Sequence, residues 1–216
     1  MKSRQLPLFP RKIRRRRARR WVAHKPREVQ SRWPLHVTLR MRDHVWQLRS
    51  RRCFRIIEGA LYAALEKLGT RIAQFSVQHS HIHLVVETRD RLRLARVIQG
   101  LAIRTAKRLN WLMGRKGKVF ADRYHSRALK TPTEVRAALL YVLANARKHL
   151  QQLGKVLPRS WTDEDYSSSP WFAGWAERRA TRAGPAPVAP AATWLLTRGW
   201  WQRGGGRLRL EEVPGS

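Results

Sequence analysis

Apolar and polar residues alternate along several segments in the first half of the chain, and this pattern predicts β-strands. The clearest example is the segment 79–87, His-Ser-His-Ile-His-Leu-Val-Val-Glu. Successive side chains of a strand point to opposite faces, so its three histidines are expected to share one face, opposite an apolar face. The same alternation predicts further strands at 35–41 and 73–77. A row of imidazoles on one strand face favours a metal or phosphate site.

Apolar residues spaced three and four apart predict three helices, at 54–68, 94–109 and 131–150. Gly69 suits the end of the first helix. The third helix has the clearest start, because Thr131-Pro132-Thr133-Glu134 combines a capping box with proline at the first helical position. Another extended segment is expected within 120–129. This order of elements predicts an α+β fold, with an antiparallel or mixed sheet flanked by helices.

Composition divides the chain into three parts. Residues 1–30 contain twelve Lys and Arg but one acidic residue, which predicts a basic flexible arm. Residues 31–150 contain the predicted strands and helices. Residues 151–216 are rich in Trp, Pro and Gly, with arginines between the tryptophans. Two interpretations of this C-terminal extension stay open: its tryptophans stack on unpaired bases as a DNA-contacting tail, or they cover the core.

The charge of the chain points to a polyanionic partner. There are 46 Lys and Arg against 14 Asp and Glu, a formal net charge of +32. Nucleic acid is the partner that such an excess favours. The longest apolar run, 137–144, is far too short to span a membrane, so no membrane partner is expected. A single cysteine, Cys53, excludes an intrachain disulfide.

Two sets of residues could carry chemistry together. Imidazoles two residues apart on a strand, at His81 and His83, can converge on one ion. Tyr141 and Asn145 lie one helical turn apart and therefore project from one face of the third helix. Asn145 could supply an oxygen ligand and Tyr141 a nucleophilic oxygen. Each set alone could also be structural, as strand histidines or as a core tyrosine with an asparagine near a helix end.

The chain resembles the single-tyrosine HUH transposases, in particular their REP-associated branch. HUH denotes two histidines around a hydrophobic residue, and here it is His81-Ile82-His83. The opening segment 36–40, the segment 120–125 and the Tyr141-x-x-x-Asn145 helix occur in the order that this family uses. The resemblance implies a ferredoxin-like or RNA-recognition-like antiparallel sheet flanked by helices.

The resemblance also implies an activity, that of a metal-dependent single-stranded DNA endonuclease and strand transferase acting on hairpin DNA. His81, His83 and Asn145 would hold Mg²⁺ or Mn²⁺, and Tyr141 would form a 5′-phosphotyrosine, leaving a free 3′-OH. The protein would be a monomer or homodimer in a prokaryotic cytoplasm, associated with the nucleoid. Ala146 departs from the family pattern, which has proline there, and His79 is a histidine that the family does not require.

Further residues are expected around this site. His79, Tyr124 and His125 are flanking candidates, and Tyr124 is the second choice of nucleophile. Nucleic-acid contacts are expected from arginines of the arm and of the segment after 120, namely Arg14, Arg15, Arg16, Arg17, Arg19, Arg20, Arg123 and Arg127. Two other functions stay open. One is a non-catalytic nucleic-acid binder on the same fold, and the other is a metal-independent nucleotide hydrolase of the histidine-triad type.

Overall fold

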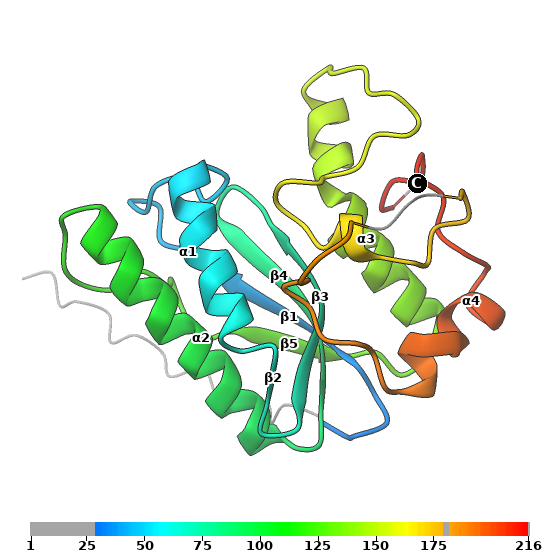
Figure 1. Cartoon of the computed structure of the whole chain (residues 1–216), viewed down its shortest axis with the longest axis horizontal. Coiled ribbons are helices and arrows are strands. Elements are labelled where there is room, and N and C mark those ends of the chain that lie inside the picture. The colour runs from blue at the N-terminus through cyan, green and yellow to red at the C-terminus, as the bar shows by residue number, and fades with distance from the viewer. Residues whose placement is uncertain (1–28, 179–181, 216) are drawn as a thin grey trace, which may run out of the picture.

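The computed structural model describes residues 29–178 and 182–215. The basic arm, with the arginines between Arg14 and Arg20, lies outside the described residues. The described chain forms one antiparallel sheet with helices on both faces (Figure 1). The predicted α+β class is therefore confirmed.

Five strands form the sheet, in the order β2-β3-β4-β1-β5, with every neighbouring pair antiparallel. The histidine-bearing strand β4 is central and pairs with β1 on one side and β3 on the other. In chain order the strands are β1 (Leu35–Arg40), β2 (Glu66–Lys67), β3 (Thr70–Val77), β4 (His81–Thr88) and β5 (His125–Ala128).

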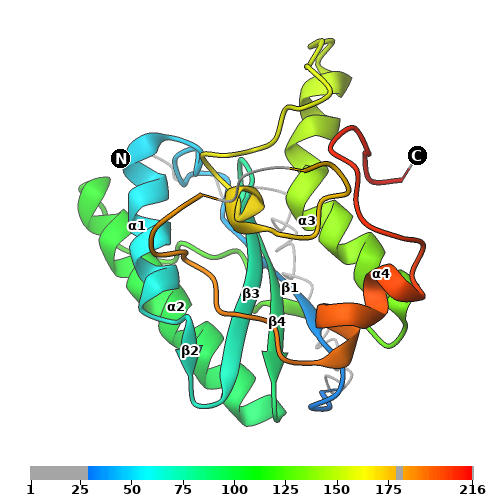
Figure 2. The ribbon, with the colours of Figure 1, turned by 45° about the vertical axis from the view of Figure 1, so that its right-hand side comes forward.

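The helices cover the two faces of the sheet unequally. α1 (Arg51–Tyr62) and α2 (Arg91–Leu112) pack together on one face, over a large apolar cluster that includes Phe75, Ile82 and Leu84. α3 (Pro132–Gln152) covers the opposite face, as the views in Figures 1 and 2 agree. No helix in the described parts of the chain is long and apolar enough to cross a membrane.

α3 begins where its sequence predicts. Thr131 is the N-cap, its hydroxyl accepts from the Glu134 backbone N–H, and the Glu134 side chain accepts from the Thr131 N–H. This reciprocal capping box with Pro132 in the first turn fixes the start of the helix. The start matters because it sets which residues of α3 face the sheet.

The first helix is shorter than predicted. α1 ends at Tyr62, and Glu66–Lys67 form β2, which turns back into β3 through Leu68 and Gly69. Both turn residues have positive φ, 54° and 68°. Two left-handed residues in a two-residue loop are the conformation of a tight hairpin turn, so Gly69 serves a hairpin and not a helix end.

Two details of the strands also differ from the prediction. β4 begins at His81, so His79 is an exposed residue before the strand and does not share its histidine face. In β3, a bulge between Ile72 and Gln74 interrupts the alternation, because both pair with consecutive residues of β4. As a result Ala73 faces the α3 side while Phe75 and Val77 face α1 and α2.

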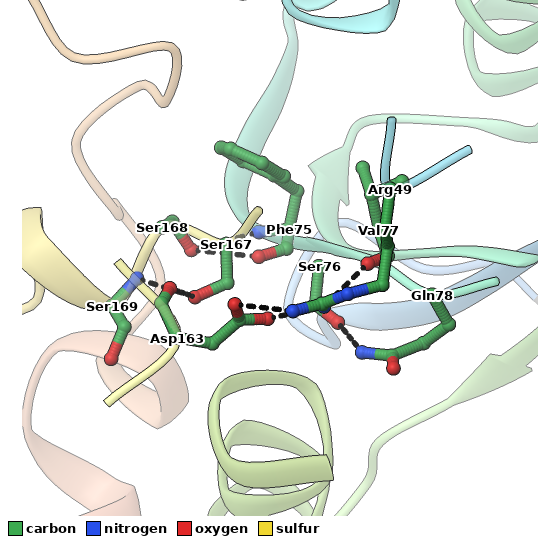
Figure 3. Close-up of polar contacts among 9 residues, drawn as sticks. All are labelled: Arg49, Phe75, Ser76, Val77, Gln78, Asp163, Ser167, Ser168 and Ser169. Carbon is green, nitrogen blue, oxygen red and sulfur yellow. Dashed lines mark hydrogen bonds and ion pairs between the residues drawn. The ribbon is translucent and has the colours of Figure 1, made fainter. Parts of the chain in front are cut away.

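The C-terminal extension covers the part of the β3 edge that lies beyond its pairing with β2. The backbone of Val77 donates to Tyr166, and Ser168 bonds Phe75 through both its backbone and its hydroxyl. Figure 3 shows the adjoining ion pair, in which Arg49 reaches Asp163 with contacts of 2.8 and 2.9 Å. An uncovered strand edge would expose unpaired N–H and C=O groups, and this segment satisfies them.

The end of the chain then packs against α3. Trp175 and Trp200 are buried in an apolar cluster with α3 residues such as Leu139 and Val142. The described part of the extension contains three short helical turns, η1 (Ser169–Trp171), η2 (Leu195–Gly199) and α4 (Trp200–Gln202), and the last lies beside α3 (Figure 2). These two tryptophans therefore cover the core, while Trp194 is about half exposed. The division at residues 30 and 150 stays a prediction.

Candidate active site

A polar row crosses the face of the sheet that α3 covers. On β4 this face carries His81 and His83, and on β1 it carries His36 and Thr38. Thr38 lies directly opposite His83, and His125 of β5 lies opposite Thr38 on its other side. Directly opposed residues project to the same face, so three strands contribute polar side chains to one patch.

α3 brings Tyr141 onto this patch. The Tyr141 ring meets His83 edge-on at 5.1 Å and His36 at 5.6 Å, centroid to centroid. Asn145, one turn further along α3, is buried at 3% exposure. The tyrosine and the second histidine of the HUH segment are thus in contact, although they are almost sixty residues apart in sequence.

Hydroxyl groups orient both HUH imidazoles through the same ring nitrogen. Nδ1 of His83 lies 3.2 Å from the Thr38 hydroxyl, and Nδ1 of His81 lies 3.0 Å from the Ser80 hydroxyl. The two rings are nearly parallel, at 13° with centroids 6.0 Å apart. Because Nδ1 is used in each ring, Nε2 of each is left to bind a ligand. Contacts of this kind fix the orientation of metal-binding histidines.

The imidazoles are held neutral by their surroundings. Burial, and then the neighbouring His36, His81 and His149, lower the pKa of His83 to about 3. Burial, followed by Arg127 and His125, lowers the pKa of His36 to about 4. Burial and Arg40 also lower the pKa of His81. Neutral imidazole is the form that binds a metal ion, so these side chains need no deprotonation at neutral pH.

The donor set fits a divalent cation that retains open positions. The described residues contain no group of three His, Cys, Asp or Glu side chains that could hold a metal. His81 and His83 would supply two nitrogens, and the Asn145 amide could supply an oxygen. Mg²⁺ is commonly bound by few protein ligands together with substrate phosphate and water. These three ligands would hold a cation only if phosphate oxygens of the substrate supply further ligands.

His36 is a residue of this patch to which the sequence had assigned no chemical role. Its Nε2 is buried and has no hydrogen-bond partner among the residues that the structure describes. Buried polar nitrogens usually have a hydrogen-bond partner. The Nε2 atom of His36, on a ring that contacts Tyr141, is therefore a place where a ligand would bind. The alternation at 35–40 indicated that His36 and Thr38 face the polar side, but only the pairing of β1 with β4 places them beside His83.

The remaining candidate residues lie at different distances from this patch. His79, His81 and His149 line an adjoining pocket of about 380 Å³ between the start of β4 and the end of α3. Tyr124 packs on the α1 and α2 side of the sheet, the face opposite Tyr141. His125 is exposed on the edge strand β5.

Two of the arginines predicted to bind nucleic acid also lie at this edge. Arg127 is exposed on β5, directly opposite His36 in the register. Arg123 is exposed just before the strand. Both can therefore be reached by a strand of nucleic acid that approaches the patch from the edge of the sheet.

The chain is similar to known proteins in sequence and in structure. A family model described as "Transposase IS200 like" matches residues 29–143, which is more than half of the chain. No curated protein matches the chain. The structure of a REP-associated tyrosine transposase bound to a REP hairpin is similar over 59% of this chain and 74% of its own, at 16% identity and a TM-score of 0.49.

A second solved structure, of a protein provisionally described as a transposase from Deinococcus radiodurans R1, is similar over 61% of this chain. It is covered over 95% of its own length, at 12% identity and a TM-score of 0.39. Both TM-scores lie below 0.5.

Proposed function

This chain belongs to the IS200-like transposase family, and on that premise we propose that it cleaves and rejoins single-stranded DNA with Tyr141 as the nucleophile. The observation that carries the proposal is the contact of the Tyr141 ring with His83 and His36. A tyrosine packed on a pair of neutral imidazoles, one of them in an HUH segment, combines a nucleophile with a phosphate-binding patch.

The reaction exchanges one phosphodiester for another. The Tyr141 phenol oxygen attacks phosphorus, the bond from phosphorus to the 3′ oxygen breaks, and that oxygen takes up a proton as a free 3′-OH. The 5′ end remains attached to the protein as a phosphotyrosine. Because one ester bond replaces another, the 3′-OH of a strand can attack the phosphotyrosine and rejoin the DNA without ATP.

His81, His83 and Asn145 are the residues that would hold Mg²⁺ or Mn²⁺. When bound, such a cation would offset the charge that develops on the scissile phosphate. Thr38 and Ser80 keep the two imidazoles oriented. The Nε2 of His36, which no group in the described parts of the chain hydrogen-bonds, is available to hydrogen-bond the phosphate or the phenol. α3, fixed by its capping box, holds Tyr141 against this patch.

The substrate is proposed to be hairpin DNA with an unpaired flank, as the family resemblance implies. A net charge of +32 suits a polyanion. Arg123 and Arg127 are exposed at the edge of β5, beside the site, where a strand could pass. The attacked phosphate is proposed to lie in single-stranded DNA, as the family resemblance also implies.

The experiment is a search for a covalent protein–DNA adduct. Hairpin oligonucleotides from the genome that carries the gene, labelled at the 3′ end and flanked by unpaired nucleotides, are incubated with protein and Mn²⁺ or Mg²⁺. The products are separated on a denaturing gel. We expect an adduct that requires the divalent ion. Tyr141→Phe should abolish it, lowering its rate of formation at least about a thousandfold, because no other group supplies the oxygen.

Tyr124→Phe is the matched control, since Tyr124 packs on the opposite face of the sheet. It should form the adduct as the wild type does. An adduct that persists in Tyr141→Phe would show that another residue is the nucleophile. Binding of the same hairpins by the wild type, with no adduct in either metal, would identify a non-catalytic binder instead.

A further inference from the structure

A second cavity, apart from the histidine patch, lies between the start of β1, the start of α3 and the C-terminal extension. Its volume is about 770 Å³, within the range of small-molecule sites. Two tryptophans and three cationic side chains are among its lining residues, which include no acid: Trp33, Trp194, Arg32, Lys130 and Arg203. An aromatic cavity ringed by cations is unlike an ordinary gap between segments.

The cations lie against the aromatic faces. The Arg32 guanidinium is 4.7 Å from the centre of the Trp33 ring, and the Lys130 ammonium is 4.9 Å from it. The Arg203 guanidinium lies 5.7 Å from the Trp194 ring. Ring faces and positive charge at this spacing are the two components that single-stranded nucleic-acid sites combine, the rings for bases and the cations for phosphates.

The exposed tryptophan is held in place by the rest of the fold. Trp194 is 47% exposed. The residue before it, Thr193, donates through its backbone and its hydroxyl to the buried Glu87 of β4, at 2.8 and 2.7 Å. Its ring packs so closely on Gly199 that a Cβ there would come within 2.6 Å of it. A large apolar ring that is positioned this firmly and still half exposed is suited to receive a ligand.

The cavity is within reach of the candidate active site. Trp33 precedes His36 by three residues, so their Cα atoms are at most about 11 Å apart. Stacked nucleotides rise about 3.4 Å each, so only a few are needed to connect the two places. Arg127, opposite His36, and Lys130, beside Trp33, provide positive charge along the way.

We propose that this cavity binds an unpaired nucleotide of the substrate strand, with its base against Trp194 or Trp33 and its phosphate among the three cations. The proposal rests on the proposed function for the choice of DNA. It adds a place where the strand is held a few nucleotides from the cleaved bond. The chain's own basic arm is a poorer occupant, because it carries the same charge as the cavity.

The test measures binding in a chelator, without cleavage. A fluorescent hairpin with a four-nucleotide unpaired flank and the same hairpin with blunt ends are titrated by anisotropy. We expect Trp194→Ala to weaken binding of the flanked hairpin about five- to a hundredfold, the loss typical of one stacked base, and to leave the blunt hairpin unchanged. Trp111→Ala is the matched control, since Trp111 is 83% exposed on α2 and lines no part of the cavity.

Abasic substitution in the flank, one position at a time, locates the base. At one flank position, the abasic substitution should weaken binding to the wild type by as much as Trp194→Ala does. The same substitution should not weaken binding to the Trp194→Ala variant any further. Equal loss on blunt and flanked hairpins, or no loss on either, would overturn the proposal. Tighter binding by Trp194→Ala would also overturn it and would indicate that the chain's own arm fills the cavity.

A measurement on the wild type covers the case in which Trp194→Ala does not fold. A flank carrying 5-iodouracil is irradiated, and the attached peptide is identified by mass spectrometry. Attachment at Trp194 or Trp33 supports the proposal, and attachment elsewhere contradicts it. These binding results are separate from the adduct assay. A protein that forms no adduct can still bind the flanked hairpin more weakly when Trp194 is replaced, and a protein that forms the adduct can lack this effect.

Discussion

The two faces of the central sheet are built from the same strands and have opposite character. Toward α1 and α2, β1 and β4 present apolar side chains, with Thr88 at the end of β4 as the exception, and Val37, Ile82 and Leu84 are completely buried. Toward α3 they present His36, Thr38 and His83. Burying apolar area stabilises the fold, whereas burying polar groups that lack full hydrogen bonding opposes it. The comparison indicates that one face maintains the fold, whereas the other carries the residues of the proposed site.

The largest expected effects come from two adjacent residues of β4 that face opposite ways. Ile82→Ala should lower the free energy of unfolding by about 2–5 kcal/mol, because it leaves a void in the apolar cluster. His83→Gln should change it by less than about 1 kcal/mol, yet reduce metal-dependent adduct formation at least about a hundredfold. Urea unfolding and the adduct assay measure the two quantities on the same proteins.

Ile82→Val serves as the milder variant if Ile82→Ala does not fold, with an expected loss of about 0.5–1.5 kcal/mol. For either substitution at Ile82, the fraction of protein that remains folded should retain the adduct rate of the wild type. If His83→Gln lowered the free energy of unfolding as much as Ile82→Ala does, the α3 face would contribute to stability as the apolar face does, and the comparison would be wrong.

The second effect is a pH dependence that arises from the histidines of the α3 face. In the folded protein the pKa values of His36 and His83 are about 4 and about 3, against 6.5 for an unperturbed histidine. The unfolded chain therefore binds more protons between about pH 3 and 6.5. The stability associated with the two neutral rings is complete above about pH 6.5 and is lost as the pH falls toward 4.

Between pH 7 and pH 5 we expect the free energy of unfolding of the metal-free protein to fall by about 2 kcal/mol for each of these histidines. The groups around them act in the same direction: Arg127 and His125 lower the pKa of His36, and His81 and His149 lower the pKa of His83. Urea unfolding in a chelator at both pH values measures the change.

His36→Gln should remove about 2 kcal/mol of that pH dependence, since it deletes one of the histidines whose pKa burial lowers. His79→Gln is the matched control and should leave the dependence unchanged, because His79 is exposed in the turn before β4. The same dependence in His36→Gln as in the wild type would show that His36 is not held neutral.

Local patterns were sufficient to predict the elements that depend on local physics. The alternation from His81 to Val86 determines which side of β4 faces the core, because a one-residue shift would bury the histidines among apolar side chains. The capping box determines where α3 begins. Both features are encoded within a few residues, so no knowledge of the rest of the fold was needed.

The parts that could not be predicted depend on which segments meet. His36 joins the site only because β1 pairs with β4 in one particular register. The cavity at Trp194 requires the C-terminal extension to return to the start of β1. The bulge at Ala73 and the hairpin at Leu68 are single-residue events that a repeating pattern does not reveal. Pairing between distant segments is a property of the whole chain.

The smallest effect concerns Glu87, a polar residue on the α3 face of β4 that is not part of the proposed site. It lies at the far end of β4 from the histidines and accepts from the Ala192 backbone and from both groups of Thr193, at 2.7–2.8 Å. Its role is therefore to hold the C-terminal extension and not to react. Glu87→Gln keeps the size of the side chain, but it places an amide N–H group against a donor. We expect a loss of about 1–2 kcal/mol in the free energy of unfolding.

Glu87→Gln should also separate anchoring from chemistry. The adduct rate at saturating DNA should be unchanged, while binding of the flanked hairpin weakens by less than it does in Trp194→Ala, because the ring remains but is held less firmly. Urea unfolding, the adduct assay and anisotropy each give one of these results. A loss of adduct at saturation would mean that the extension positions Tyr141 through α3, and that the two ends of the α3 face act together.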